Sequence, residues 1–163
     1  MDIGTDEDAA RDEIMKAIPL SDVIKLSGEE AELLVREPDP KRAGRLIEMM
    51  GPGLVAVTLA EKGCIAVTAR YGVEVAGHKT QVQDTTGAGD AFTAAMLVKL
   101  VEMGGDILSN PSLLGDLELI RIFQFANAAG ALTTTATGAI PALPQRDQVE
   151  AFLERERSKA PLQ

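Results

Sequence analysis

Asp84–Phe92, with the sequence DTTGAGDAF, is the stretch around which the rest of the chain is organised. It leads into residues 91–101, where only Thr93 and Lys99 interrupt the apolar side chains, and this composition predicts a buried helix. The first N–H groups of a helix have no partners within it, and here they emerge from small residues that let a ligand approach the backbone. Because the positive end of the helix dipole favours an anion, the loop is a candidate anion site.

Two carboxylates, Asp84 and Asp90, flank this candidate anion site. A carboxylate is a poor ligand for an anion, but it can act as a base or bind a cation. A glycine turn followed by an acid that complements the helix dipole would explain the same residues structurally.

The nine residues resemble the second signature of the PfkB (ribokinase-like) carbohydrate kinases, and the surrounding sequence is most similar to plant-type fructokinases. This resemblance implies that Asp90 is the base that takes the proton from a sugar hydroxyl. It also implies that the backbone of Gly87, Ala88 and Gly89 forms the anion hole for the transferred phosphoryl group, with ATP and Mg²⁺ as cofactors. Phosphoryl transfer suits such a site, because its catalysis is mostly positioning and charge stabilisation.

Composition narrows the class of protein. A length of 163 residues suits a single domain, residues 1–163, and 45% hydrophobic residues are enough for a core. The net charge of −9 argues against a nucleic-acid partner or an anionic membrane surface. With one cysteine, no apolar run of membrane-spanning length and an acidic beginning without a signal-peptide pattern, we expect a cytoplasmic protein.

The order of apolar runs and breakers predicts a layered α/β domain with a mainly parallel sheet. The resemblance makes this the C-terminal portion of a ribokinase-like three-layer α/β/α fold. Strands are expected at residues 22–26, 54–58, 64–68 and 71–76. Helices are expected from a capping box of Thr5 and Asp8, from Ser27, from Asp39, over 91–101, over about 116–133, and from Asp147.

Four residues match positions that contact the nucleotide in the family. Thr58 and Gly63 are the first and last residues of TLAEKG. This segment is similar to the family's T-x-G-x-x-G turn, with Ala60 in place of the middle glycine. Asn127, within FANAAGA, and Gly138, in the loop 136–139, match the elements that border the adenine. A plain strand-end turn would also explain the first pair, and a tightly packed helix whose Asn bonds to backbone would explain Asn127.

Three residues are candidate cation ligands. Glu30 matches the acid of the family's N-x-x-E motif, which orders water around Mg²⁺, although Ser27 replaces the Asn and S-x-x-E is itself a capping box. Asp84 and Thr86 match positions that hold a monovalent cation such as K⁺ in relatives.

The resemblance covers only the C-terminal half of a family member. The first glycine-rich signature, the sugar-binding residues and the lid sheet of complete relatives are not present, so an exposed sheet edge is expected, covered in a homodimer or by a partner. The expected function is an ATP-dependent sugar kinase. A fructokinase acting on fructose is the first expectation, and a ribokinase or adenosine kinase type is the alternative within the family. The alternative is a non-catalytic, kinase-derived nucleotide-binding or scaffold protein.

Overall fold

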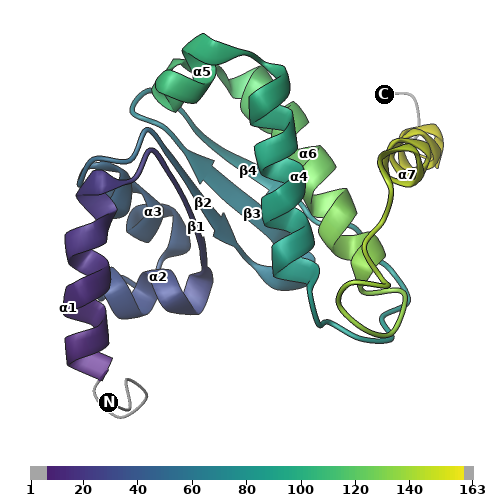
Figure 1. Cartoon of the computed structure of the whole chain (residues 1–163), viewed down its shortest axis with the longest axis horizontal. Coiled ribbons are helices and arrows are strands. Elements are labelled where there is room, and N and C mark those ends of the chain that lie inside the picture. The colour runs from purple at the N-terminus through teal and green to yellow at the C-terminus, as the bar shows by residue number, and fades with distance from the viewer. Residues whose placement is uncertain (1–6, 160–163) are drawn as a thin grey trace.

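The computed structural model describes residues 7–159, which form an open sheet with helices on both faces (Figure 1). The strands are β1 (Val23–Ser27), β2 (Leu54–Thr58), β3 (Gly63–Val67) and β4 (Gly72–Ala76). The α-helices are α1 (Glu7–Ala17), α2 (Gly28–Val35), α3 (Pro40–Glu48), α4 (Ala88–Glu102), α5 (Gly105–Ser109), α6 (Asp116–Thr133) and α7 (Arg146–Lys159). Short 3-10 turns are η2 (Ile18–Leu20), η3 (Ala60–Lys62) and η4 (Pro111–Leu113). The predicted capping box of Thr5 and Asp8 lies outside the described side chains.

The sheet has the order β1-β2-β3-β4 and is mixed, so the expectation of a mainly parallel sheet is wrong for this portion of the fold. Only β1 and β2 run parallel, with Val23 opposite Leu54, and the α2–α3 segment makes the crossover. β2–β3 and β3–β4 are antiparallel. The physical reason is the length of the connections, because η3 and the turn before β4 are far too short for a parallel crossover.

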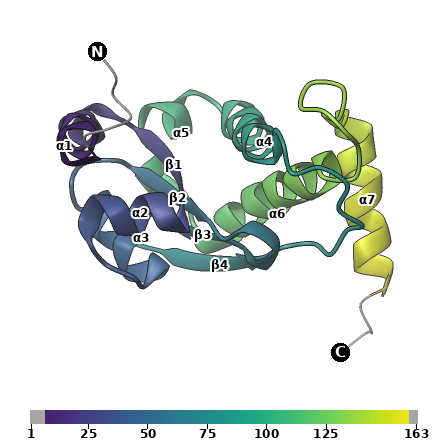
Figure 2. The same cartoon turned by 90° about the horizontal axis from the view of Figure 1, so that it is seen from below.

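Alternation along the strands divides the core into two layers. In β2, Leu54 and Ala56 face α4 and α6, whereas Val55 and Val57 face the layer of α1, α2 and α3. Figure 2 shows these two helical layers on opposite sides of the sheet. The predicted three-layer α/β/α arrangement is therefore confirmed.

Helix α4 is buried on one face only, which corrects the expectation that it is buried all round. Phe92, Met96 and Leu100 are inside the core. On the opposite face Val98 and Val101 are 43% and 61% exposed, because none of the described elements packs over them. The apolar composition of α4 predicts that other elements cover it on every side, but the described elements cover only one of its faces.

The hairpin of β3 and β4 requires glycine at its start. Gly63 has φ +106°, and a Cβ added to it would lie 2.1 Å from the carbonyl oxygen of Val75. This residue, predicted to contact a nucleotide, therefore has a structural requirement of its own, since only glycine allows both the conformation and the close approach of the strands.

We expect Gly63→Ala to destabilise the chain by about 3 kcal/mol or more, because it adds a backbone collision to an unfavourable φ. Gly104→Ala is the matched control, since Gly104 also has a positive φ (+96°) but nothing lies within 4 Å of its added Cβ. That variant carries the backbone strain without the collision, about 1–3 kcal/mol, and should lose less stability than Gly63→Ala. Urea unfolding followed by circular dichroism measures both, and equal losses would contradict this account of the hairpin.

Candidate active site

The carboxylate of Asp84 organises the signature loop. Its Oδ1 accepts hydrogen bonds from the backbone N–H of Thr86 (2.9 Å) and from the Thr86 hydroxyl (2.6 Å). Its Oδ2 accepts one from the backbone N–H of Gly138 (2.9 Å). These three donors, the Thr86 hydroxyl first, lower the pKa of Asp84 from its ordinary value of 3.8 to about 2. The carboxylate thus stays ionised and joins the signature loop to the loop after α6.

Gly87 sets the direction in which α4 begins. It is the N-cap residue with φ +82°, and an added Cβ would lie 3.0 Å from both Cα and Cβ of Ala139. The neighbouring helix is equally close, because a Cβ on Gly130 of α6 would lie 3.2 Å from the carbonyl oxygen of Ala88. Small residues on both helices therefore fix where the first turn of α4 lies.

The first turn of α4 offers unbonded N–H groups. The helices α2 and α3 begin with side-chain caps from Ser27 and Asp39, whereas α4 has none. The N–H of Ala88 donates to the carbonyl of Thr85 (3.2 Å), but no acceptor is found within residues 7–159 for the N–H of Gly87 or Gly89. A helix terminus in this state is suited to an anion.

Asp90 lies in the same first turn and is exposed. Its carboxylate makes no hydrogen bond or ion pair in the part of the chain that the structure describes, so it is open to an incoming ligand.

Lys25 is a candidate site residue that none of the sequence motifs marks. It lies in β1 on the sheet face that carries Val23, towards α4, and its Nζ is 3.5 Å from the position of a Cβ added to Gly89. No carboxylate within residues 7–159 pairs with this half-buried ammonium group. A cation next to the positive end of a helix is electrostatically unfavourable unless an anion lies between them. The signal in the sequence was a single charge in the apolar run VIKLS.

The candidate nucleotide residues have structural partners in this state. The Asn127 side chain is buried and its Nδ2 donates to the carbonyls of Val75 (3.0 Å) and Ala76 (3.2 Å), which ties α6 to the end of β4. The Thr58 hydroxyl donates to the carbonyl of Leu26 (3.2 Å). The structural alternative for Asn127 is thus present, and nucleotide contacts from Thr58, Gly63, Asn127 and Gly138 stay predictions.

Ala60 replaces the middle glycine of the T-x-G-x-x-G pattern without changing the backbone conformation that a glycine would adopt there. It has φ +51°, in the left-handed region where glycine is favoured. The turn therefore keeps the conformation that a glycine would adopt, with the methyl group of Ala60 added to it.

The candidate cation ligands do not form a carboxylate cluster. The predicted capping box is confirmed, with the N–H of Ser27 donating to Glu30 Oε2 (2.6 Å) and the N–H of Glu30 to the Ser27 hydroxyl (3.1 Å). Asp84 and Thr86 bond to each other as described above. Among residues 7–159 there is no group of three or more His, Cys, Asp or Glu side chains placed to hold a metal ion. The Mg²⁺ and K⁺ roles stay predictions.

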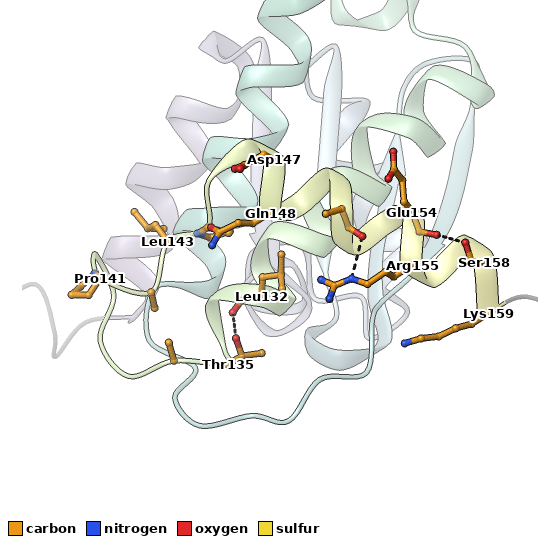
Figure 3. A pocket seen from close by; sticks show the side chains of 14 residues that line it. Leu132, Thr135, Pro141, Leu143, Asp147, Gln148, Glu154, Arg155, Ser158 and Lys159 are labelled. Atoms are coloured by element: carbon orange, nitrogen blue, oxygen red, sulfur yellow. Dashed lines mark hydrogen bonds between the residues drawn. The ribbon is translucent and has the colours of Figure 1, made fainter.

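A separate groove lies between the end of α6, the loop 134–145 and α7 (Figure 3). Thr135, Pro141, Gln148 and Arg155 are among its lining residues, and Arg155 Nε donates to the carbonyl of Ala151 (3.2 Å). The groove shares the loop that Asp84 holds through Gly138, but neither Asp90 nor the amides of the first turn of α4 line it.

No helix among residues 7–159 combines the length and the hydropathy needed to cross a bilayer.

Among residues 7–159, the uncapped start of α4, the unpaired Lys25 and the exposed Asp90 lie together at one end of a layered sheet, and they form a candidate anion-binding site in an α/β protein. The model of the pfkB family carbohydrate kinases matches residues 3–146, and the chain belongs to this family.

Relatives and solved structures agree on the family and the fold. The Arabidopsis thaliana protein "Probable fructokinase-6, chloroplastic" is 41% identical over 151 residues, which are 90% of this chain and 38% of that protein. A fructokinase with bound ATP from Xylella fastidiosa superposes with a TM-score of 0.79 and 28% identity, over 95% of this chain and 48% of its own. A Vibrio cholerae fructokinase in its fructose, ADP and calcium ion bound form gives 0.73 and 33%, over 88% and 44%. The chain thus spans less than half the length of these relatives and has the ribokinase-like fold.

The low pKa of Asp84 predicts an acid-dependent contribution to stability. Because the folded-state pKa is depressed, the stabilisation is complete above about pH 4 and is lost as the pH falls towards about 2. Asp84→Asn should therefore be less stable than the wild type at pH 7, and the two urea midpoints should converge across that window. Midpoints that differ by the same amount at pH 7 and pH 2 would contradict the role of the ionised carboxylate.

Proposed function

We propose that this chain is the nucleotide-binding and catalytic portion of an ATP-dependent sugar kinase, and that the sugar is fructose. The observation that carries the proposal is the convergence of unbonded N–H groups, Lys25 and Asp90 on the first turn of α4. Family membership supports the reaction class, and the similarity to plant and bacterial fructokinases supports the substrate. A ribokinase or adenosine kinase type remains the alternative within the family.

Each group has a defined task in this proposal. The Asp90 carboxylate takes the proton from the acceptor hydroxyl as that oxygen forms its bond to the γ-phosphorus, and ADP leaves with the bridging oxygen. The N–H groups of Gly87 and Gly89 donate to the phosphoryl oxygens, with Ala88 between them shaping the hole. Lys25 opposes the charge that builds up on those oxygens.

Cation ligands belong to the same proposal. Mg²⁺ would be held mainly by the nucleotide and by water, with Glu30 as an outer acid, and would neutralise phosphate charge. Asp84 and Thr86 would border a K⁺, since a carboxylate oxygen can accept more contacts than the hydrogen bonds already present. Thr58, Gly63, Asn127 and Gly138 would shape the nucleotide pocket.

A cytoplasmic location also belongs to this proposal. The one cysteine, Cys64, is buried, and burial raises the pKa of its thiol to about 12, so it stays protonated and unreactive. Nothing in this chemistry calls for an oxidising compartment or for a nucleic-acid partner.

The alternative function is a kinase-derived binding or scaffold protein, and the exposed apolar face of α4 favours it. The two functions differ in nucleotide binding. Calorimetry that detects no binding of Mg·ATP would favour the scaffold, whereas binding supports the kinase portion.

Lys25→Met should weaken the binding of Mg·ATP by about 10-fold, because a charge-assisted contact to a phosphate oxygen is lost. Lys41→Met removes the same charge from α3, where Lys41 pairs with Glu74 at the surface (3.0 Å), and should change the Kd little. Isothermal calorimetry on the purified chain compares the three proteins. Equal affinities for wild type and Lys25→Met would remove Lys25 from the site.

Asp90→Asn should lower kcat by about 10²- to 10⁴-fold, because the amide cannot take the proton, while Mg·ATP affinity is kept. The assay measures ADP release with fructose, ribose and adenosine, using the chain joined to the segment of the Arabidopsis relative that it does not match. Asp116→Asn, an exposed acid in the first turn of α6, is the control. Undiminished turnover by Asp90→Asn would refute the assignment of the base.

A further inference from the structure

The segment of residues 77–87 joins β4 to α4 and contains the signature loop, but it belongs to no helix or strand. Its course therefore depends on hydrogen bonds to other elements. Among the described residues, every hydrogen bond made by residues 79–83 leads to Thr134, the C-cap residue of α6. Figures 1 and 2 show the segment running beside this end of α6. One residue thus holds the approach to the signature loop.

The backbone carbonyl of Thr134 accepts two hydrogen bonds from the segment. The N–H of Gln83 donates to it at 2.8 Å, and the N–H of Asp84 donates to it at 3.3 Å. The last carbonyls of a helix have no partners within it and lie at the negative end of its dipole, so donors are favoured there. The residues that lead into the signature loop therefore complete the end of α6, and the backbone of Asp84 is fixed to that helix.

The side chain of Thr134 makes a second link to the segment. Its hydroxyl donates to the carbonyl of Ala131 in the preceding turn (2.7 Å) and lies 3.1 Å from the hydroxyl of Thr80. Because the one hydroxyl proton of Thr134 is already used, the Thr80 hydroxyl is the donor and the Thr134 oxygen is the acceptor. Both side chains are half-buried, so water would replace a lost partner only in part.

We propose that Thr134 is a positioning residue of the candidate anion site. It fixes residues 80–84 to the end of α6, and the Asp84 carboxylate can then accept its hydrogen bonds from Thr86 and Gly138. The loop held in this way presents the unbonded N–H groups at the start of α4. The role rests on the proposed function, in which the ligand of those groups is a nucleotide phosphate, and Thr134 acts on that ligand through Asp84.

Thr135 provides a matched control for the side chain of Thr134. Its hydroxyl donates to the carbonyl of Leu132 at 2.7 Å, which is the same bond to the preceding turn, and it is also half-buried. In the part of the chain that the structure describes, Thr135 makes no hydrogen bond to residues 80–84. Thr134→Val and Thr135→Val therefore lose the same bond within the end of α6 and should have the same urea midpoint, but only Thr134→Val loses the link to Thr80.

The test measures the loop and the site separately in the full chain. In Thr134→Val, the N–H groups of Gln83 and Asp84 should exchange about 5-fold faster by NMR, because the segment opens more often. The Kd for Mg·ATP, measured by calorimetry, should rise by about 5-fold in the same variant. Thr135→Val should match the wild type in both measurements. Thr134→Ser keeps the hydroxyl and should restore both, which a role of the methyl group in packing would not.

Thr80→Val removes the other partner of the same hydrogen bond. It should reproduce both changes seen in Thr134→Val, and the double variant should add nothing to either single variant. Additive effects of the two substitutions would contradict a direct link between the hydroxyls.

Two results would overturn the proposal: equal exchange rates in Thr134→Val and Thr135→Val, or faster exchange in Thr134→Val with an unchanged Kd for Mg·ATP. A wild-type chain that binds no Mg·ATP would instead overturn the proposed function. The exchange rates would then decide alone whether Thr134 holds the loop, so the two failures are distinguishable.

Discussion

The site depends on one carboxylate that holds two distant loops together. Asp84 accepts hydrogen bonds from Thr86 in its own loop and from Gly138, 54 residues further along the chain. Because an ionised acceptor strengthens each of these bonds, the loop before α4 keeps its shape without a side-chain cap on the helix. The N–H groups of Gly87 and Gly89 are left unbonded as a consequence. Asp84 thus accepts the hydrogen bonds that hold the loop in shape, and the N-terminal end of α4 remains available for an anion.

The sequence predicted the parts of this site that depend on local rules. The capping box of Ser27 and Glu30, the Pro40 start of α3 and the uncapped glycine start of α4 each follow from chemistry within a few residues. Lys25 could not be placed in this way, because its proximity to Gly89 depends on how β1 and α4 pack. Asn127 was left between two interpretations for the same reason, since its partners are backbone carbonyls of β4.

The prediction that α4 is buried on every side is wrong for a different physical reason. Hydrophobic periodicity reports which side chains avoid water in the assembled protein, whatever chain supplies the cover. Residues 91–101 therefore predict a helix that is buried all round, whereas α6 and the sheet cover only one of its faces. The mixed sheet could be inferred from connection lengths alone, because the four residues 59–62 cannot make a parallel crossover between β2 and β3.

The exposed state of Asp90 follows from the same geometry and bears on how the site would work. Asp90 is held in the first turn of α4 by backbone that Asp84 and Gly130 position, so it needs no partner of its own to stay in place. Its open face continues into the exposed apolar side chains of α4 from Ala94 to Val101. Closing that face would both exclude water and bring an acceptor hydroxyl to the carboxylate, which are the two conditions phosphoryl transfer to a sugar requires. Within residues 7–159, the candidate anion site at the start of α4 thus has a defined backbone on one side and an open face at Asp90 on the other.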